Sequence, residues 1–285
     1  MTLLKMLQVC CCCFFLGVAS AFQSHHVGQQ RRKPNSGDDD RCALIFLHGM
    51  GDTARGWSSL DHMLPSICPH LSSVEYIFPQ APVKPVTLNG GELVPAWFDL
   101  FDWPVDSTSR DDVHGQLNSV CKLEDIVKKV EEEKGIPASR IVVGGFAQGG
   151  AIAMLASYYR KERRDQPFAG CICISGWLPN SWSFPVNSYV AEMTPLLWCH
   201  GAYDGKVLNH QQILGVQRLL KEGVNVTTFT YPCAHESYNL QEVKDMAEFI
   251  DNALFPKVPK EKVVAKFVAS VKYLFDEHDS EKYKP

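Results

Sequence analysis

Three positions in the second half of the chain have the order of a nucleophilic hydrolase, with one atom missing. Gly145-Phe-Ala147-Gln-Gly149 has the spacing of a G-x-S-x-G nucleophile elbow, where a strand turns sharply into a helix with the central side chain at the tip. Asp204 and His235 follow, in the order nucleophile, acid, histidine. The carboxylate would fix the tautomer of an imidazole that deprotonates the nucleophile. The pattern indicates acyl transfer, but Ala147 has a methyl group in place of the serine hydroxymethyl.

A second motif supplies hydrogen-bond donors for the same chemistry. Acyl transfer needs N–H groups aimed at the developing oxyanion. The residue after the nucleophile position offers the N–H of Gln148, and the loop His48-Gly-Met-Gly51 offers the N–H of Met50. The same glycines would equally suit a plain tight turn. We expect His48 to brace this loop and not to act as a base.

No other side chain is well placed in the sequence to replace the missing hydroxyl as nucleophile. Ser175 follows a different strand, and Cys233 lies two residues before His235, where its thiol would be misdirected. A water activated by His235 is the remaining route, and loss of a triad member leaves about 10³–10⁴-fold catalysis over water. We therefore expect the chain to be inactive or nearly so as written.

The elements that must position these residues alternate between strands and helices. Apolar runs predict buried strands at 42–47, 74–78, 141–143, 168–174, 196–199 and 226–231. Helical spacing is found at 53–64, 111–134, 151–159, 209–221 and 240–253. This alternation predicts an α/β fold with a largely parallel central sheet and helices on both faces. His48, Ala147, Asp204 and His235 each follow a strand, so they should meet at the carboxyl edge of the sheet.

Length and composition bound the remaining interpretations. The 285 residues, 45% hydrophobic, fit one α/β domain at 41–253 with extensions at both ends. A net charge of −4 argues against a nucleic-acid binder. Outside the run Cys10–Cys13, the other seven of the eleven cysteines include no C-x-x-C pair and no zinc-ligand spacing, so no metal site is predicted. We expect most of the scattered cysteines to be buried thiols, not a disulfide framework. Residues 80–110 are rich in Pro and Gly and are expected to be irregular.

The N-terminus has the pattern of a targeting segment. In residues 1–21, Lys5 gives a weak positive start, Met6–Val18 is apolar and Ala19-Ser-Ala21 is a cleavage pattern, which together predict entry into the secretory pathway. An uncleaved membrane anchor and S-palmitoylation of Cys10–Cys13 are alternatives. Ala19-Ser-Ala-Phe22 also resembles the cleavage motif of proteins sent to secondary plastids of algae. Residues 22–40 are then either a polar linker or a transit segment.

The C-terminal extension, 254–285, contains an amphipathic stripe with lysines around it. One interpretation is a peripheral membrane-surface helix, and the other is an extra helix packed on the domain or on a partner. The stripe consists of Val264, Phe267, Val268, Val271, Leu274 and Phe275.

Several segments together resemble the acyl-protein thioesterase and lysophospholipase-like carboxylesterase family, over residues 41–253. They are Leu47-His-Gly-Met-Gly-Asp-Thr53, Trp97-Phe-Asp99, Gly135-Ile-Pro137, Arg140–Gly150, Ser175-Gly-Trp-Leu-Pro179, His200-Gly-Ala-Tyr-Asp204 and Ala234-His235. The resemblance implies an α/β-hydrolase that cleaves long-chain acyl thioesters or esters without a cofactor. Its implied substrates are acylated proteins or lysolipids. It also implies that Trp177 and residues 80–110 border an acyl channel.

The departure at Ala147 leaves two hypotheses. In the first, the chain is a serine hydrolase in which Ala147 is an introduced substitution or an error in the sequence. In the second, it is a natural pseudoenzyme that holds acyl chains or acylated proteins without cleaving them. Asp204, His235 and the oxyanion loop are all retained. Their retention favours a recent or artificial change, or a site kept for binding.

Overall fold

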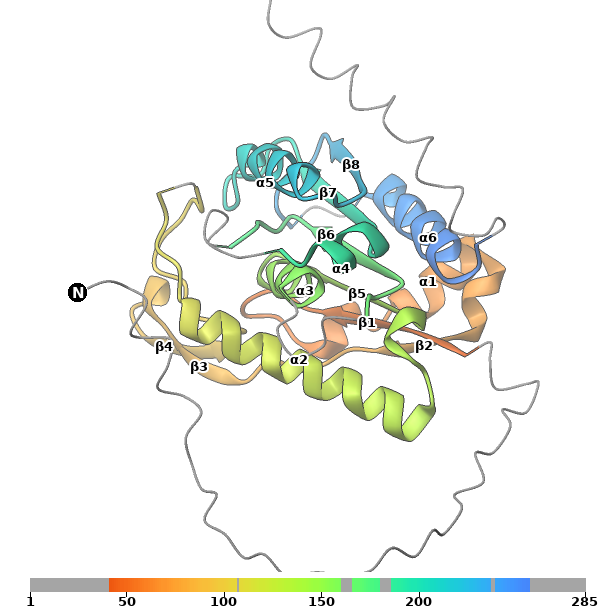
Figure 1. Ribbon diagram of the computed structural model, residues 1–285. Helices are drawn as coiled ribbons and strands as arrows, with labels where there is room; N and C mark the ends of the chain where they lie inside the picture. The colour runs from red at the N-terminus through yellow and green to blue at the C-terminus, as the bar shows by residue number, and fades with distance from the viewer. Residues whose placement is uncertain (1–40, 107, 160–165, 180–185, 237–238, 257–285) are drawn as a thin grey trace, which may run out of the picture. The chain divides into compact units, whose positions relative to one another are not determined.

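The computed structural model describes residues 41–106, 108–159, 166–179, 186–236 and 239–256 (Figure 1). The predicted targeting segment 1–21, the segment 22–40 and the amphipathic stripe at 264–275 lie outside these ranges and stay predictions. Within the described ranges, no helix combines the length and the apolar character needed to cross a membrane.

A six-stranded sheet, in the order β2-β1-β5-β6-β7-β8, forms the centre of the fold. All its neighbouring strands are parallel. Every residue of β1, β6 and β7 is buried, as expected for strands covered on both faces. The predicted α/β class with a parallel sheet is confirmed. The strands are β1 Cys42–Leu47, β2 Val74–Ile77, β5 Ile141–Phe146, β6 Gly170–Ile174, β7 Leu196–Gly201 and β8 Val226–Tyr231.

Helices cover both faces of this sheet (Figure 1). One face carries α2 Val113–Lys134, α3 Gln148–Tyr158, α4 Ser188–Met193 and α5 Asn209–Lys221, and the other carries α1 Leu60–Ile67 and α6 Leu240–Leu254. Successive residues of β1 point into opposite cores: Ile45 packs with α2 and α3, and Leu44 packs with α1 and α6. The seven cysteines of the described ranges are free thiols, four of them buried, as expected.

The first predicted helix, 53–64, is wrong in its bounds. The Asp52 carboxylate accepts the Thr53 N–H at 2.7 Å and the Trp57 Nε1–H at 3.0 Å. These bonds hold a separate 3₁₀ turn, η2 (Ala54–Trp57), so α1 begins only at Leu60. Pro65, expected beyond the helix, lies inside it. Its missing N–H costs α1 a hydrogen bond, which burial of the apolar face of this short helix offsets.

The segment 80–110 was predicted to be irregular, and this prediction is wrong in part because the segment contains a β-hairpin. Strands β3 (Val83–Val86) and β4 (Glu92–Pro95) pair antiparallel, joined through the 3₁₀ turn η4 (Thr87–Asn89). Gly90 and Gly91 complete the turn with φ of 66° and 88°, which favour glycine. Pro85 and Pro95 obscured the strand signal in the sequence. Proline is tolerated here because both strands of an isolated hairpin are edge strands.

Backbone segments pack closely where α3 crosses the ends of β1 and β5. A Cβ on Gly149 would come within 2.2 Å of the Leu47 carbonyl oxygen. A Cβ on Gly145 would come within 2.4 Å of the carbonyl carbon of Gly149. The neighbouring atoms are backbone, which cannot rotate away. Only glycine fits at these two positions.

Gly149→Ala should therefore destabilise the fold by about 1–3 kcal/mol or prevent folding, as overpacking does. Gly205→Ala is the matched control, because no atom lies within 4 Å of its added Cβ. The control should stay within about 0.5 kcal/mol of the parent. Urea unfolding measures both. Equal stability of the two variants would contradict the close crossing.

Candidate active site

Ala147 lies at the tip of the turn between β5 and α3 in a strained conformation. Its φ of 49° and ψ of −114° are uncommon for a residue with a Cβ and cost about 1–3 kcal/mol. Its N–H donates to the Ile174 carbonyl at 2.9 Å, and its carbonyl accepts the Ala151 N–H at 3.0 Å. A Cβ built on Gly49 would lie 3.6 Å from the Ala147 Cβ. The elbow tip therefore faces the loop after β1.

Asp204 and His235 lie together at the ends of the neighbouring strands β7 and β8. His235 Nδ1 donates to Asp204 Oδ2 at 2.7 Å, and both side chains are buried. Because the carboxylate accepts at Nδ1, neutral His235 has a lone pair on Nε2. The His235 ring packs 4.9 Å from that of Phe146, the residue before the elbow tip. The structure thus brings the three predicted positions 147, 204 and 235 to one edge of the sheet.

A dense hydrogen-bond network holds Asp204. Its Oδ1 accepts the N–H groups of Lys206 and Val207 at 2.9 and 2.8 Å. Its Oδ2 lies 3.2 Å from His200 Nε2 as well as accepting from His235. Burial opposes ionisation of Asp204, but the hydrogen bonds from His200 and His235 outweigh it, so the pKa of this carboxyl lies well below its ordinary value. Asp204 is therefore a fixed anion beside His235.

His200 is a positioning residue to which the sequence analysis gave no role. It is fully buried at the end of β7. Its Nε2 lies 2.8 Å from the Val207 carbonyl, which can only accept, so Nε2 carries the proton that also faces Asp204. His200 could have been found from the sequence, because it lies four residues before Asp204 and inside an otherwise apolar strand. Trp103 was not singled out within the segment 80–110, which was expected to border an acyl channel. In this segment, Val105 donates to the Lys206 carbonyl at 2.7 Å, and the Trp103 ring meets His235 edge-on at 6.2 Å.

His48 braces the loop after β1, as its placement predicts. Its Nδ1 donates to the Gly49 carbonyl at 2.7 Å, and its Nε2 accepts the Ala81 N–H at 3.0 Å. Burial lowers the pKa of His48, despite opposing contributions from Gly49 and Asp52. Both ring nitrogens are thus engaged in a neutral imidazole.

Two N–H groups are available at the elbow. Among the described residues, the Met50 N–H has no acceptor, whereas the next N–H, that of Gly51, is used by the Pro95 carbonyl at 2.8 Å. Gln148 is the first residue of α3, where an N–H has no partner within the helix. Its side chain bonds the Trp97 N–H at 3.0 Å and the Phe98 carbonyl at 2.9 Å, leaving the backbone N–H free. These are the two donors expected from the sequence.

The remaining predicted residues also lie near the elbow. Trp177 is buried and packs edge-on against Phe98 at 5.7 Å. Its contact with an acyl chain stays a prediction. Ser175 has a φ of 49°, and no hydrogen bond joins it to His235 in the described part of the chain. Burial, with nearby carboxylates, raises the pKa of the Cys233 thiol, which makes it a poor nucleophile.

Comparison with known proteins identifies the family of the chain. The sequence profile of the Phospholipase/Carboxylesterase family matches residues 34–254. The chain belongs to this family. Its resemblance to acyl-protein thioesterases and carboxylesterases of the α/β-hydrolase fold is thereby confirmed.

Two acyl-protein thioesterases match about three quarters of this chain and most of their own length. Acyl-protein thioesterase 1 homolog 1 of Dictyostelium discoideum is 34% identical over 213 residues, which are 75% of this chain and 91% of that protein. Acyl-protein thioesterase 1 of Neurospora crassa is 37% identical over 225 residues, 76% of this chain and 88% of that protein.

Solved structures give the same result. Arabidopsis thaliana SOBER1 has a TM-score of 0.67 at 27% identity, covering 75% of this chain and 99% of that chain. Zea mays acyl-protein thioesterase 2 has a TM-score of 0.65 at 27% identity, covering 75% and 94%. This phospholipase/carboxylesterase family member therefore has an acyl-protein thioesterase-type hydrolase scaffold.

The lowered pKa of Asp204 makes the free energy of unfolding of this family member depend on pH in the acid range. Its pKa in the folded state is lower than the unfolded value of about 3.9, so its stabilising contribution is present above that pH and is lost as pH falls. Asp204→Asn should lower the free energy of unfolding at pH 7, and the gap to the parent should narrow at pH 3. Urea unfolding at both pH values measures it. Asp125→Asn, at an exposed α2 position, should show no such narrowing. A gap that widens in acid would refute the assignment.

Proposed function

We propose that this chain is a serine-hydrolase scaffold for long-chain acyl thioesters or esters, of the palmitoyl-protein or lysophospholipid type, that is inactive or nearly so because Ala147 replaces the nucleophilic serine. The binding site is the elbow of Ala147 with Asp204 and His235. The observation that carries the proposal is a buried, hydrogen-bonded acid–histidine pair beside two free N–H groups, arranged around a methyl group. Every part of an acyl-transfer site except the nucleophile is in place.

The proposed chemistry follows from these positions. With a serine at 147, His235 Nε2 would remove the hydroxyl proton as the oxygen attacked the acyl carbonyl. The N–H groups of Met50 and Gln148 would stabilise the oxyanion, and the thiol or alcohol would leave with the proton from His235. Water would then attack the acyl-enzyme while His235 takes its proton. The acid would leave as the oxygen of residue 147 regains that proton from His235. Ala147 has no oxygen to form the acyl-enzyme, so only direct attack by water remains.

The substrate class rests on the relatives and on the side chains around the site. Three of the proteins named above carry the name acyl-protein thioesterase, which suggests an acylated protein as substrate or ligand. Aromatic rings surround the histidine and the elbow: those of Phe146 and Trp103 contact His235, and Trp177 packs on Phe98. Rings of this kind suit a long acyl chain better than a polar leaving group.

A natural pseudoenzyme is the second candidate. It is favoured by the complete set of hydrogen bonds around Asp204, which persists without a nucleophile to serve. In this case, the site holds the acyl group of a lipidated protein or lysolipid without cleaving it. The two candidates share one scaffold and differ in what a restored hydroxyl achieves.

Ala147→Ser should raise kcat for a palmitoyl thioester by about 10⁶-fold, the loss caused by removal of a serine nucleophile. The rate of thioester cleavage measures this, and mass spectrometry should find an acyl group on residue 147 in the variant alone. Ala147→Ser combined with His235→Ala is the control and should remain inert. If the variant stays inert while both forms bind acyl ligand, the pseudoenzyme candidate is favoured. Rapid hydrolysis by the Ala147 parent would sink both candidates.

Asp204→Asn in the Ala147→Ser background should lower kcat by about 10⁴-fold, because His235 then loses the anion that sets its tautomer. The KM should change little, because Asp204 makes no contact with substrate in the proposed chemistry. Asp125→Asn in the same background is the matched control and should keep full activity. Steady-state kinetics separate kcat from KM. A loss confined to KM would contradict the role given to Asp204.

A further inference from the structure

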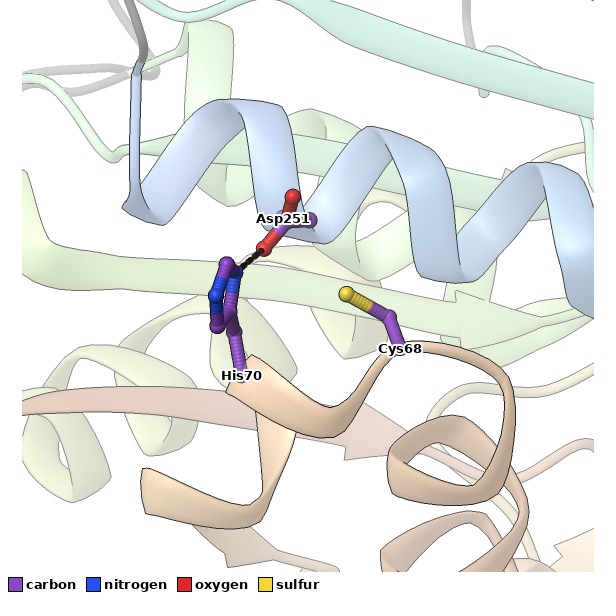
Figure 2. Close-up of side chains that lie close together, drawn as sticks. All are labelled: Cys68, His70 and Asp251. Atoms are coloured by element: carbon purple, nitrogen blue, oxygen red, sulfur yellow. Dashed lines mark hydrogen bonds and ion pairs between the residues drawn. The ribbon is translucent and has the colours of Figure 1, made fainter.

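A cluster of metal-ligating side chains lies where the turn after α1 meets the last turns of α6. Cys68 ends α1, His70 lies in the 3₁₀ turn η3 (Pro69–Ser73), and Asp251 belongs to α6. The thiol sulfur, a ring nitrogen and a carboxylate oxygen all lie within 4.8 Å of one another. Figure 2 shows the thiol and the imidazole both facing the carboxylate. This cluster is built from residues other than those of the candidate active site.

The backbone holds two of these groups on one rigid turn. Cys68 and His70 flank Pro69, whose ring fixes its φ. The Leu71 N–H donates to the Cys68 carbonyl at 3.0 Å, and the Ser73 hydroxyl donates to the His70 carbonyl at 2.9 Å. The third group comes from the opposite element, because α6 packs against α1 and η3. The three donors are therefore pre-arranged by separate, well-packed elements.

The cluster is buried at one end and open to solvent at the other, so an ion from solvent can reach it. The Asp251 side chain is 12% exposed and the His70 side chain is 70% exposed. The His70 ring packs against Phe255 with centroids 6.0 Å apart, which limits its rotation. Asp251 thus forms the floor of the cluster, and His70 forms its edge towards solvent.

The arrangement does not suit a cysteine nucleophile. A catalytic thiol needs the imidazole beside its sulfur to take the proton. Here His70 Nδ1 faces Asp251 Oδ1 at 3.2 Å, and the Cys68 sulfur lies within 4.8 Å of both groups. A thiol, an imidazole and a carboxylate that converge in this way leave a centre that a cation can occupy.

We propose that Cys68, His70 and Asp251 bind a divalent transition-metal ion, with Zn²⁺ as the best match. Thiolate, imidazole and carboxylate are zinc ligands, and a thiolate disfavours Mg²⁺ and Ca²⁺. Donors around a tetrahedral zinc lie about 3.3–3.6 Å apart, given metal–ligand bonds of about 2.0–2.3 Å. The imidazole and carboxylate are already at 3.2 Å, so side-chain rotation of the thiol can complete the set.

Binding has a defined proton balance and a structural effect. Zn²⁺ displaces the thiol proton to solvent, and the imidazole coordinates through Nδ1 after its proton has passed by way of solvent from Nδ1 to Nε2. Water fills the fourth position. The ion joins His70 to Asp251, which are 181 residues apart in the chain, and so ties the turn after α1 to the end of α6. An ion that binds only the folded state raises its stability.

The test uses the full chain with Cys10–Cys13 replaced by serine, so that this run does not compete for metal. After chelator treatment, calorimetry measures Zn²⁺ binding, and thermal unfolding measures the shift in Tm. Co²⁺ in place of zinc should give the charge-transfer absorption of a thiolate ligand. We expect one ion per chain, a higher Tm with Zn²⁺, and a thiolate band with Co²⁺.

Single ligand variants decide whether this cluster is the site. Cys68→Ser, His70→Ala and Asp251→Asn should each weaken binding by more than the ~10–100-fold that loss of an outer hydrogen-bond partner causes. Cys68→Ser should also abolish the thiolate band. Controls are Cys121→Ser, an exposed thiol on α2, and His62→Ala, an exposed imidazole on α1. Both controls should bind as the parent does.

A further variant separates metal binding from a merely structural role. His70→Cys supplies a second thiolate and should bind Zn²⁺ where His70→Ala does not, even if both lower the Tm of the metal-free chain equally. The proposal is overturned if Zn²⁺ leaves the Tm unchanged in the parent. It is equally overturned if the ligand variants bind Zn²⁺ with the affinity of the controls.

Discussion

The close contact of α3 with the ends of β1 and β5 is the constraint on which the site depends. At Gly149 the helix backbone touches the Leu47 carbonyl, with no room for a side chain between them. This contact sets the start of α3, and with it the free N–H of Gln148, directly beside the loop after β1. The same contact fixes Ala147 at the tip of the turn. A wider crossing would separate the nucleophile position from the oxyanion donors.

The sequence predicted the sheet and the edge at which the site forms, for a simple physical reason. Strands buried on both faces appear as continuous apolar runs, and parallel strands all end at the same edge. Ala147, Asp204 and His235 could therefore be brought together from their order alone. The β3–β4 hairpin could not be predicted, because Pro85 and Pro95 interrupt its pattern and it lies outside the main sheet. Its strands depend on pairing that local sequence does not encode.

The sequence did not predict the hydrogen bonds that support Asp204 or the cluster of side chains from distant parts of the chain. His200 supports Asp204 from within an apolar strand, where a single histidine has many ordinary explanations. The cluster of Cys68, His70 and Asp251 has no spacing signature, because Asp251 follows His70 by 181 residues in the chain. Such groups meet only when α6 packs on α1, so tertiary contacts and not motifs define them.

The strained backbone at Ala147 has a consequence for how this scaffold can evolve. The left-handed φ is imposed by the surrounding turn and not by the side chain, so a small residue of either kind fits there equally well. Alanine and serine codons can differ by a single base. The fold therefore tolerates loss or recovery of the hydroxyl without rearrangement. A lineage with this scaffold could pass between cleaving and retaining acyl groups by one point mutation.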